Sequence, residues 1–528
     1  MRTPVRAALA ASIAMLIAAT SPFAQKRARP ALASADIDAI ATLLMMEDAR
    51  TFDEPELQRI LKSPHAEVRR RAVQSIGRIA VKRGAGLLEA ARGDQDTEVV
   101  ATAVWSAGQL RDPLAVPWLS ATLSDGKAPT SIAVEAAIAL GKIQSPDARA
   151  ALAQYLLSAP ATSAAPIVGE ALLSIGRFAA GESIDPIVRW TTSADVEIRW
   201  RATWALFRPR DPAAVKELLR LSTDSSATVR SWAVRGLIPH PAIDAAPEAA
   251  RLRDATRDPD RRVRTEALRA LGLHDDEASL KIVLEMLDSP DTWLSVSAAE
   301  ALARQTERAE VVAPRLVAAA GLARPLSLRL TARQSLGRLG AVGKIMLDRL
   351  TTEGLPQAPP PGSRGPRPQP QLRTLPEYRR IVERWIVPDY KGAPKPRAIW
   401  ETPRGVIELE LYPGDAPLGV EFFSRVMESE DIVGTEFTRV VPNFVAQQRA
   451  IRNDVVLRDE VSRRGLTRGN LSWASGGLDS GRPGYTLGVT PQPHNEGNFT
   501  ALGRVVKGMD VLEQLELGDA ITAALMVR

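Results

Sequence analysis

The sequence predicts a multidomain protein in which an α-solenoid of helical repeats is followed by a closed β-barrel. Three observations predict this fold class. A short motif recurs along the first two thirds of the 528 residues, a proline-rich stretch follows it, and from Ala398 onward the apolar pattern alternates as in strands. A chain of this length is also too long for a single hydrophobic core. We therefore expect a leader at 1–24, repeats at 37–350, a linker at 351–396 and a barrel domain at 397–528.

The recurring motif has the form V-R-x-x-A-x-x-A-L-G, and its apolar residues fall on one face of a helix. A second amphipathic helix follows each copy. Several copies close on a glycine, among them Gly77, Gly108 and Gly141, as a helix C-cap would. Nine central alanines mark the copies at spacings of 31 to 35 residues: Ala72, Ala103, Ala136, Ala171, Ala202, Ala233, Ala267, Ala298 and Ala332. No single unit buries its apolar face, so stacking of neighbours must supply the core.

This repeat pattern resembles the HEAT-like repeats of bacterial proteins. The resemblance implies an extended surface that binds protein partners. Four tryptophans of the array have two open interpretations: they line a binding groove, or they pack between adjacent helices, which is the favoured alternative. These residues are Trp105, Trp200, Trp204 and Trp232.

The N-terminus predicts export. Arg2 and Arg6 precede an apolar run over residues 7–19, and small residues then lead to the polar Gln25. This arrangement is typical of a secretory signal peptide, and its apolar core is too short to span a bilayer comfortably. An uncleaved membrane anchor is the alternative. We expect a periplasmic or secreted protein with no membrane association after cleavage of residues 1–24.

Composition excludes several classes of chemistry. The chain contains no cysteine, which rules out thiol nucleophiles, zinc–thiolate sites and a lipidated cysteine. Its four histidines are far apart and show no ligand spacing, so we expect neither metal nor cofactor. The net charge of +6 is small for this length and no basic block with interleaved aromatics is present, so we expect no nucleic-acid partner.

The linker region changes composition sharply. Seven prolines lie within residues 356–370, with several arginines and no acidic residue. Such a stretch favours an extended, polyproline-like spacer. A short helix is expected at residues 376–385. The spacer predicts that the two folded regions are loosely coupled.

The C-terminal region has the pattern of a strand-rich domain. Ile407, Leu409 and Leu411 face one side of a half-buried strand. An amphipathic helix is expected at residues 418–427, and short strands follow to the end of the chain. A closed β-barrel of about 130 residues is the simplest arrangement of these segments.

Five blocks of this region, in order, are similar to the cyclophilin family of peptidyl-prolyl cis-trans isomerases. The most specific is G-T-E-F-T-R-V-V-P-N-F-V-A-Q at residues 434–447. The five blocks span residues 402–412, 415–423, 434–447, 469–474 and 499–510. The resemblance implies a catalytic arginine at Arg439. It also implies substrate-binding positions at Phe444, Val445, Gln447, Ala474, Ser475, Thr486, His494, Asn495 and Phe499.

Several of these positions depart from the family's pattern. The family typically has asparagine where this chain has Ser475, and phenylalanine where it has Thr486. His494 stands near a tryptophan found in many members, Asn495 replaces an apolar residue, and Phe499 takes the place of a common histidine. The implied catalytic cation is retained while half of the proline pocket is altered.

The chemistry implied by the resemblance is rotation about an X–Pro amide, whose uncatalysed barrier is roughly 18–20 kcal/mol. A fixed cation near the prolyl nitrogen favours the twisted state, and Arg439 fits that role. We therefore expect an isomerase that acts on proline-containing exported client proteins, with the repeats as a protein-binding platform. The alternative is a non-catalytic, protein-binding scaffold with a degenerate cyclophilin domain.

Overall fold

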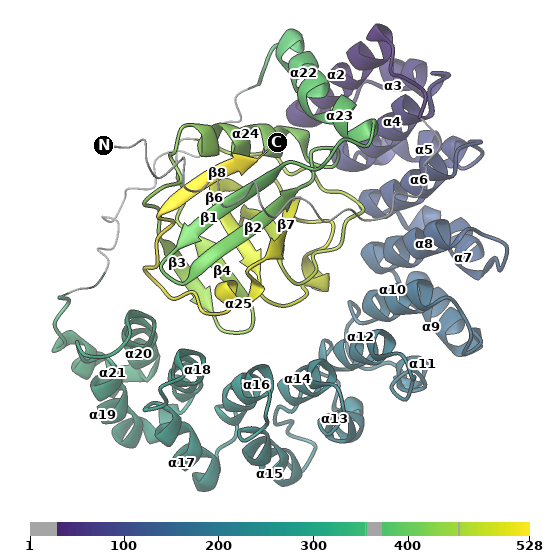
Figure 1. Ribbon diagram of the computed structural model, residues 1–528. Coiled ribbons are helices and arrows are strands. Elements are labelled where there is room, and N and C mark those ends of the chain that lie inside the picture. Colours follow the sequence, from purple (N-terminus) through teal and green to yellow (C-terminus); the bar gives the residue numbers. More distant parts are fainter. Residues whose placement is uncertain (1–28, 354, 356–371, 452–454, 528) are drawn as a thin grey trace. The chain divides into compact units, whose positions relative to one another are not determined.

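The computed structural model describes residues 29–353, 355, 372–451 and 455–527. The expected signal peptide at 1–24 and the proline-rich stretch at 356–370 lie outside these ranges. Residues 29–353 are almost entirely helical, and residues 397–527 contain all the strands of the described chain (Figure 1). No helix among the described residues is long and apolar enough to cross a membrane.

The helical region consists of paired helices joined by short turns. Its α-helices are α2 (Ser34–Ala49), α3 (Glu54–Leu61), α4 (Ala66–Ile79), α5 (Ala85–Ala91), α6 (Thr97–Leu110), α7 (Val116–Ser124), α8 (Thr130–Ile143), α9 (Pro146–Ser158), α10 (Ala165–Ile175), α11 (Asp185–Val188), α12 (Val196–Phe207), α13 (Val215–Leu221), α14 (Ala227–Arg235), α15 (Ala246–Ala255), α16 (Arg261–Leu271), α17 (Glu277–Met286), α18 (Thr292–Leu302), α19 (Ala309–Ala319), α20 (Leu326–Arg338) and α21 (Gly340–Asp348). Short 3₁₀ turns are η1 (Lys82–Gly84), η2 (Pro113–Ala115), η3 (Pro212–Ala214) and η4 (Thr306–Arg308).

The motif helices are the even-numbered ones from α4 to α20, and each contacts the next in the series. All nine marker alanines lie on these helices and have no exposed surface. A methyl group is the largest side chain that fits where two helices stack this closely, because interiors are packed without spare volume. The predicted stacking of repeats is confirmed.

The motif glycines have two different roles. Gly176 and Gly272 end α10 and α16, as expected. Gly77, Gly108 and Gly141 lie inside α4, α6 and α8, whereas the left-handed residue that ends α4 is Ala80. A Cβ atom on Gly77 would lie 2.6 Å from the Oγ of Ser106 on the next motif helix. The C-cap interpretation is therefore wrong for these glycines, which instead allow neighbouring helix backbones to approach each other.

The motif arginine ties some of the repeats to the next one. Arg69 donates from Nε and Nη2 to the carboxylate of Asp94 at 2.7 and 2.9 Å, and from Nη1 to the carbonyl of Ser63. Arg199 repeats this bidentate arrangement with Asp224, four repeats further along the array. Such paired donors fix both distance and orientation, so this residue serves the architecture of the solenoid.

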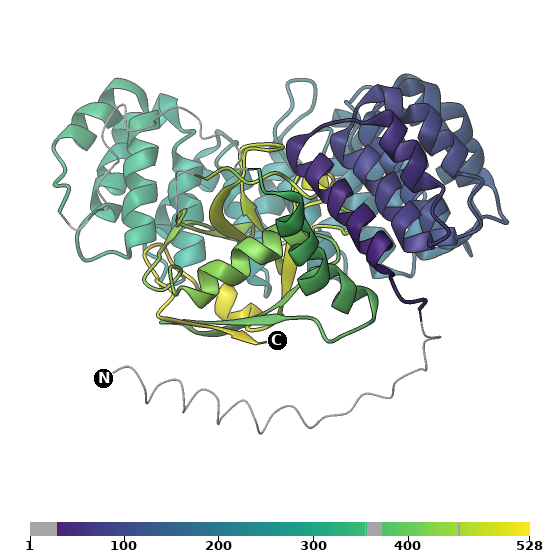
Figure 2. The same ribbon diagram turned by 90° about the horizontal axis from the view of Figure 1, so that it is seen from above.

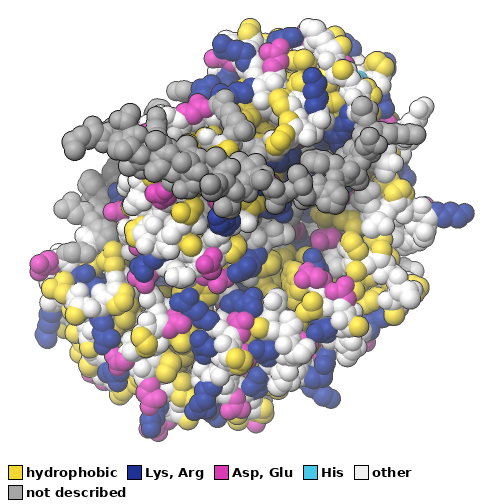
Figure 3. Space-filling view, in the orientation of Figure 1, with side chains coloured by type: hydrophobic (Ala, Val, Ile, Leu, Met, Phe, Trp, Pro, Cys, Tyr) yellow, Lys and Arg dark blue, Asp and Glu magenta, His cyan; other side chains and the backbone are white. Residues whose placement is uncertain are grey.

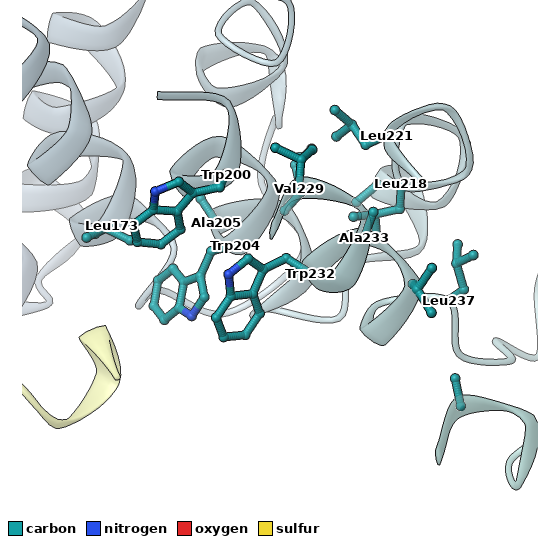
Figure 4. Packing of buried hydrophobic residues seen from close by; sticks show 14 of the residues in the cluster. Leu173, Trp200, Trp204, Ala205, Leu218, Leu221, Val229, Trp232, Ala233 and Leu237 are labelled. Carbon is teal, nitrogen blue, oxygen red and sulfur yellow. The ribbon is translucent and has the colours of Figure 1, made fainter. Parts of the chain in front are cut away.

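The four array tryptophans are buried, with 1 to 6% of their surface exposed. Figure 4 shows Trp200, Trp204 and Trp232 among the alanine and leucine side chains of neighbouring helices. Packing between helices, the favoured interpretation, is therefore confirmed. Trp204 and Trp232 also border a cavity described below.

One helix connects the two regions. It consists of α22 (Leu375–Ile381), the π-helical segment η5 (Val382–Ile386) and α23 (Val387–Tyr390), so the helix expected at residues 376–385 is longer at both ends. It lies against α2, as Figure 2 shows. The hydroxyl of Tyr378 donates to Oδ2 of Asp48 at 2.7 Å, and Arg373 pairs with the same carboxylate at 3.0 Å. The end of the linker is thus attached to the first repeat.

The C-terminal region is one antiparallel sheet of eight strands in the order β3-β4-β6-β5-β7-β2-β1-β8. Its elements are β1 (Arg397–Thr402), β2 (Gly405–Leu411), α24 (Pro417–Glu428), β3 (Phe437–Val441), β4 (Val445–Gln448), β5 (Asn470–Ala474), β6 (Arg482–Gly488), η6 (Pro493–Asn495), β7 (Ala501–Lys507), α25 (Met509–Leu512) and β8 (Ala523–Val527). Its core is aromatic: the rings of Trp400, Phe423, Trp473 and Tyr485 lie 5.0 to 6.1 Å apart between centroids.

The sheet curls without closing into a continuous barrel. Its edge strands β3 and β8 are not paired with each other in the described chain. An isolated bridge, Glu436 to Ala520, and main-chain hydrogen bonds between residues 434–437 and 518–521 join the start of β3 to the segment before β8. The closed barrel expected from the sequence is therefore a curled, eight-stranded sheet.

The array and the sheet are docked against each other. Leu32 to Arg528 form one compact unit, in which the sheet lies inside the arc of the motif helices (Figure 1). Arg78 of α4 is the most deeply buried link. It pairs with Glu47 at 2.7 Å, donates to the main-chain oxygens of Val461 (2.9 Å) and Glu460 (3.3 Å), and also reaches Asp415.

Further contacts reach from the first repeats to the last. They join Arg50 to Asp479, Arg463 to Glu98 and Glu135, Arg177 to Glu496, Arg269 to Pro442, Thr292 to Glu516, and Ser327 to Leu517. The structure thus contradicts the expected loose coupling, because these polar links are numerous and several are partly or fully buried. On the outer face shown in Figure 3, basic and acidic side chains are interspersed.

Candidate active site

The predicted catalytic arginine lies in a row of side chains that crosses three strands. In the strand register, Arg439 of β3 stands opposite Gln447 of β4, and Gln447 stands opposite Thr486 of β6. Nη1 of Arg439 lies 3.5 Å from Oε1 of Gln447, at the limit of a hydrogen bond. The two polar groups therefore face the same side of the sheet and leave donors free for a ligand.

An aromatic side chain lies next to this row. The tight turn between β3 and β4 brings Phe444 back toward Arg439, whose guanidinium carbon is 5.6 Å from the ring centroid. The turn requires a left-handed residue, and Asn443 supplies it with φ of 52°. On its other side Phe444 stacks on the imidazole of His494, with centroids 6.5 Å apart and the planes inclined by 19°.

Burial lowers the pKa of both Arg439 and His494. For Arg439, the negative charge of Glu300 on α18 opposes this fall in pKa; a guanidinium stays protonated regardless. The pKa of His494 falls to about 4, first because the ring is desolvated and then because Arg208, Arg235 and Arg177 repel a second cation. The site at neutral pH therefore has a fixed cation and a neutral imidazole.

Two cavities border this constellation. The first, of about 390 Å³, is lined by Phe444, His494 and Val441 on the sheet side and by array residues on the other. The second, of about 470 Å³, lies beyond Gln447 and is lined by Ala474 and Ser475 among others. Arg439 itself lines neither cavity, whereas its neighbours Phe444 and Gln447 line one each.

The structure brings together most, not all, of the residues singled out in the sequence. Val445 is 2% exposed and points into the domain. Asn495 donates from Nδ2 to Oε1 of Gln492 at 2.8 Å, within its own loop. Phe499 is half-buried, and neither it nor Asn495 nor Val445 lines the two cavities. The hydroxyl of Ser475 is bonded locally to Gly477.

Sequence reasoning missed the contribution of the array to this site. The first cavity is completed by side chains of α12, α14, α16 and α18 and of the turns after α12 and α18: Trp204, Phe207, Arg208, Arg210, Trp232, Arg235, Glu266, Arg269, Glu300 and Arg304. The available signal was that arginines recur near the ends of successive motif helices. It did not indicate which face of the array meets the sheet.

No metal site accompanies this arrangement. Among the described residues no three His, Asp or Glu side chains gather in a way that could hold a metal ion. The arrangement itself, a fixed cation beside an apolar floor and an amide that can hold a peptide backbone, suits a change of conformation rather than bond cleavage. The fold and site thus define a peptide-binding domain of the prolyl-isomerase class.

Comparison with known proteins identifies the family. The family model of cyclophilin type peptidyl-prolyl cis-trans isomerases matches residues 398–525, and that of HEAT repeats matches segments between residues 54 and 337. This chain belongs to the cyclophilin-type peptidyl-prolyl cis-trans isomerases, through its C-terminal domain. The resemblances stated from the sequence are confirmed.

Three relatives illustrate the match. The peptidyl-prolyl cis-trans isomerase B of Bacillus subtilis is 31% identical over 123 residues, which are 22% of this chain and 86% of the relative. An isomerase of Synechococcus elongatus is 28% identical over 25% of this chain and 96% of its own length. One of Helicobacter pylori is 30% identical, with 23% of this chain and 80% of the relative covered. Each match is confined to about a quarter of the chain.

Proposed function

We propose that this protein isomerises X–Pro bonds in exported client proteins, and that the helical repeats hold part of the client beside the active site. The observation that carries the proposal is the grouping of Arg439, Gln447 and Phe444 on one face of β3 and β4. A cation, an amide and an aromatic floor are the three groups that the reaction requires.

The mechanism follows from amide resonance. Rotation about the X–Pro bond passes through a twisted state in which the prolyl nitrogen becomes pyramidal and its lone pair, delocalised in the planar amide, is localised on the nitrogen. The guanidinium of Arg439 donates to that nitrogen more strongly in the twisted state than in the planar one, which lowers the barrier. Phe444 holds the pyrrolidine ring and Gln447 holds the adjacent backbone, so the flanking carbonyl is the part that turns.

The export and client-binding parts of the proposal are supported by different observations. The basic and apolar N-terminal pattern favours secretion, which would place the clients outside the cytoplasm. The repeats match a family model of HEAT repeats, and stacked repeats of this kind present extended binding surfaces. Their arc brings α12 to α18 next to Phe444, so a bound client would reach the active site directly.

The test is a proline-isomerisation assay on the full chain. Arg439→Ala should lose most activity, since removal of one preorganised transition-state donor costs on the order of 10²–10³ in rate. The matched control is Arg504→Ala on β7, an exposed arginine paired with Glu410 away from the site. Equal activity of wild type and Arg439→Ala, at matched folding by circular dichroism, would remove the catalytic assignment.

A second candidate function is proline binding without turnover. It is favoured by the locally bonded hydroxyl of Ser475 and by the amide of Asn495, which is turned toward Gln492. These groups are therefore less available to a substrate. Tight binding of proline peptides by a chain that shows no isomerisation would support this alternative.

A further inference from the structure

The cavity beside Phe444 is built jointly by the two regions of the chain. Val441, Phe444, Thr490, Pro491 and His494 form its sheet side. The array side comes from the C-terminal parts of α12, α14, α16 and α18 and the turns that follow them. Its volume of about 390 Å³ is within the range of peptide and ligand pockets. A substrate residue that flanks the proline on the Phe444 side would lie next to this space.

The floor of the cavity is aromatic. Trp204 and Trp232 project from neighbouring helices and lie next to each other in Figure 4. Phe207 stacks on Trp232 with centroids 5.7 Å apart. The guanidinium of Arg235 lies 5.4 Å from the centroids of both rings, which holds it above the floor. Such a floor accepts the apolar stem of a side chain and places a cation at its tip.

The rim of the cavity is strongly basic. Five arginines line it, Arg208, Arg210, Arg235, Arg269 and Arg304, against two glutamates, Glu266 and Glu300. Both glutamates are already engaged: Glu266 accepts from Asn443 at 2.8 Å and lies 3.3 Å from Arg269, and Glu300 pairs with Arg269 at 2.9 Å.

Three of the rim arginines retain free charge. Arg208, Arg210 and Arg304 are exposed and make no ion pair with any residue that the structure describes. The positive electrostatic potential of these arginines extends to the sheet side of the cavity. Arg208 and Arg235 are among the groups that, together with burial, keep His494 neutral. A negative charge placed in the cavity would be attracted by all of them, in a site partly shielded from water.

We propose that this cavity selects substrates with an acidic side chain, Asp or Glu, next to the isomerised X–Pro bond. The inference rests on the proposed isomerase function. The stem of the acidic residue would lie on Trp204 and Trp232, and its carboxylate would meet Arg208, Arg210 and Arg304. The array thereby acts as part of the active site and determines substrate choice.

The experiment uses the full chain and three blocked peptides that differ only in the residue next to the X–Pro bond: Glu, Gln or Lys. Both kcat/KM for isomerisation and Kd by fluorescence anisotropy are measured. We expect kcat/KM and binding affinity to be roughly five- to tenfold higher for the Glu peptide than for the Gln peptide, and the difference from the Lys peptide to be larger. High salt should reduce this preference. A phosphoserine peptide shows whether the rim distinguishes carboxylate from phosphate.

The variant Arg208→Gln/Arg210→Gln/Arg304→Gln should remove the preference for Glu over Gln. Its matched control is Arg257→Gln/Arg338→Gln/Arg349→Gln, which removes the same charge from exposed arginines that do not line the cavity. The control should keep the preference. Equal constants for the Glu and Gln peptides in wild type, or a preference that survives in the first variant, would overturn the inference.

Failure of the proposed isomerase function would give a different result from failure of the acid-selective cavity. If wild type isomerises none of the peptides, the isomerase assignment fails, and Kd alone then decides the inference. Tighter binding of the Glu peptide that is lost in the first triple variant would still support an acid-selective cavity. Equal Kd values for Glu and Gln would overturn it.

Discussion

Asn443 of the strand domain donates from its side-chain Nδ2 to Oε1 of Glu266, on array helix α16, at 2.8 Å. Both side chains are buried, and Asn443 immediately precedes Phe444, the floor of the candidate active site. Arg269 of the same helix donates to the carbonyl of Pro442 at 2.8 Å. The turn that positions Phe444 is therefore attached on two sides to the helical repeats.

This attachment predicts the effect of Asn443→Gly. Glycine keeps the left-handed backbone but removes the donor to Glu266, so we expect a stability loss of about 1–3 kcal/mol and a roughly tenfold fall in kcat/KM. Thermal unfolding measures the stability loss, and the isomerisation assay measures the fall in kcat/KM. Ala80→Gly, at a left-handed and exposed helix end, is the control and should change neither by much. Unchanged kinetics in Asn443→Gly would show that the array does not position Phe444.

The residues beside Arg439 should have graded effects. Gln447→Ala removes a neutral hydrogen bond to the substrate backbone, so we expect roughly a two- to tenfold loss in kcat/KM, less than for Arg439→Ala. Thr486→Phe adds an apolar wall next to Gln447 and should lower KM more than it raises kcat. Gln514→Ala, at an exposed position just after α25, is the matched control. A larger loss in Gln447→Ala than in Arg439→Ala would reverse the roles assigned to the two residues.

The buried link at Arg78 should control docking. Arg78→Ala leaves Glu47 without its buried partner and removes donors to three carbonyls, so unfolding should require about 3–5 kcal/mol less. Chemical denaturation measures this value. Arg59→Ala breaks an exposed pair with Glu56 and should cost about 0–1 kcal/mol. Equal stability of the two variants would mean that the Arg78 contacts do not hold the regions together.

Docking also predicts how cleaved protein behaves. Trypsin cleavage after Arg364, in the proline-rich stretch, should yield two fragments that still elute together in size-exclusion chromatography. The buried and half-buried polar contacts that run from α2 to α20 would hold them together. The same cleavage of Arg78→Ala should allow at least partial separation. Complete separation of the wild-type fragments would restore the loosely coupled arrangement expected from the linker.

His494 predicts a pH dependence of stability. Its pKa is about 4 in the folded chain, against 6.5 for an ordinary histidine, because burial and nearby arginines disfavour the cation. Between these values the unfolded chain binds a proton that the folded chain does not, so stability falls as pH falls from about 6.5 to 4. The free energy of unfolding of wild type relative to His494→Gln should therefore drop by up to about 3 kcal/mol over that window. A difference independent of pH would contradict the shift.

The sequence by itself determined the local structure and the family. The period of about 33 residues predicted stacked helix pairs because helices with one apolar face must bury it on neighbours. The alternating segments and the block around Arg439 predicted the strand domain and placed Arg439, Gln447 and Phe444 together, because they share two adjacent strands and the turn between them. Gly77, Gly108 and Gly141 were wrongly expected to end their helices, since a sequence shows where glycine occurs but not which backbone approaches it.

Only the tertiary structure decided how the two regions combine. Arg78 and Glu47 were two ordinary charges in separate helices until folding buried them against the carbonyls of Glu460 and Val461. Arg208 and Arg304 likewise became part of the active-site rim only because the array curves around Phe444. Contacts between residues hundreds of positions apart depend on the summed geometry of every intervening repeat, and no local pattern in the chain records that sum.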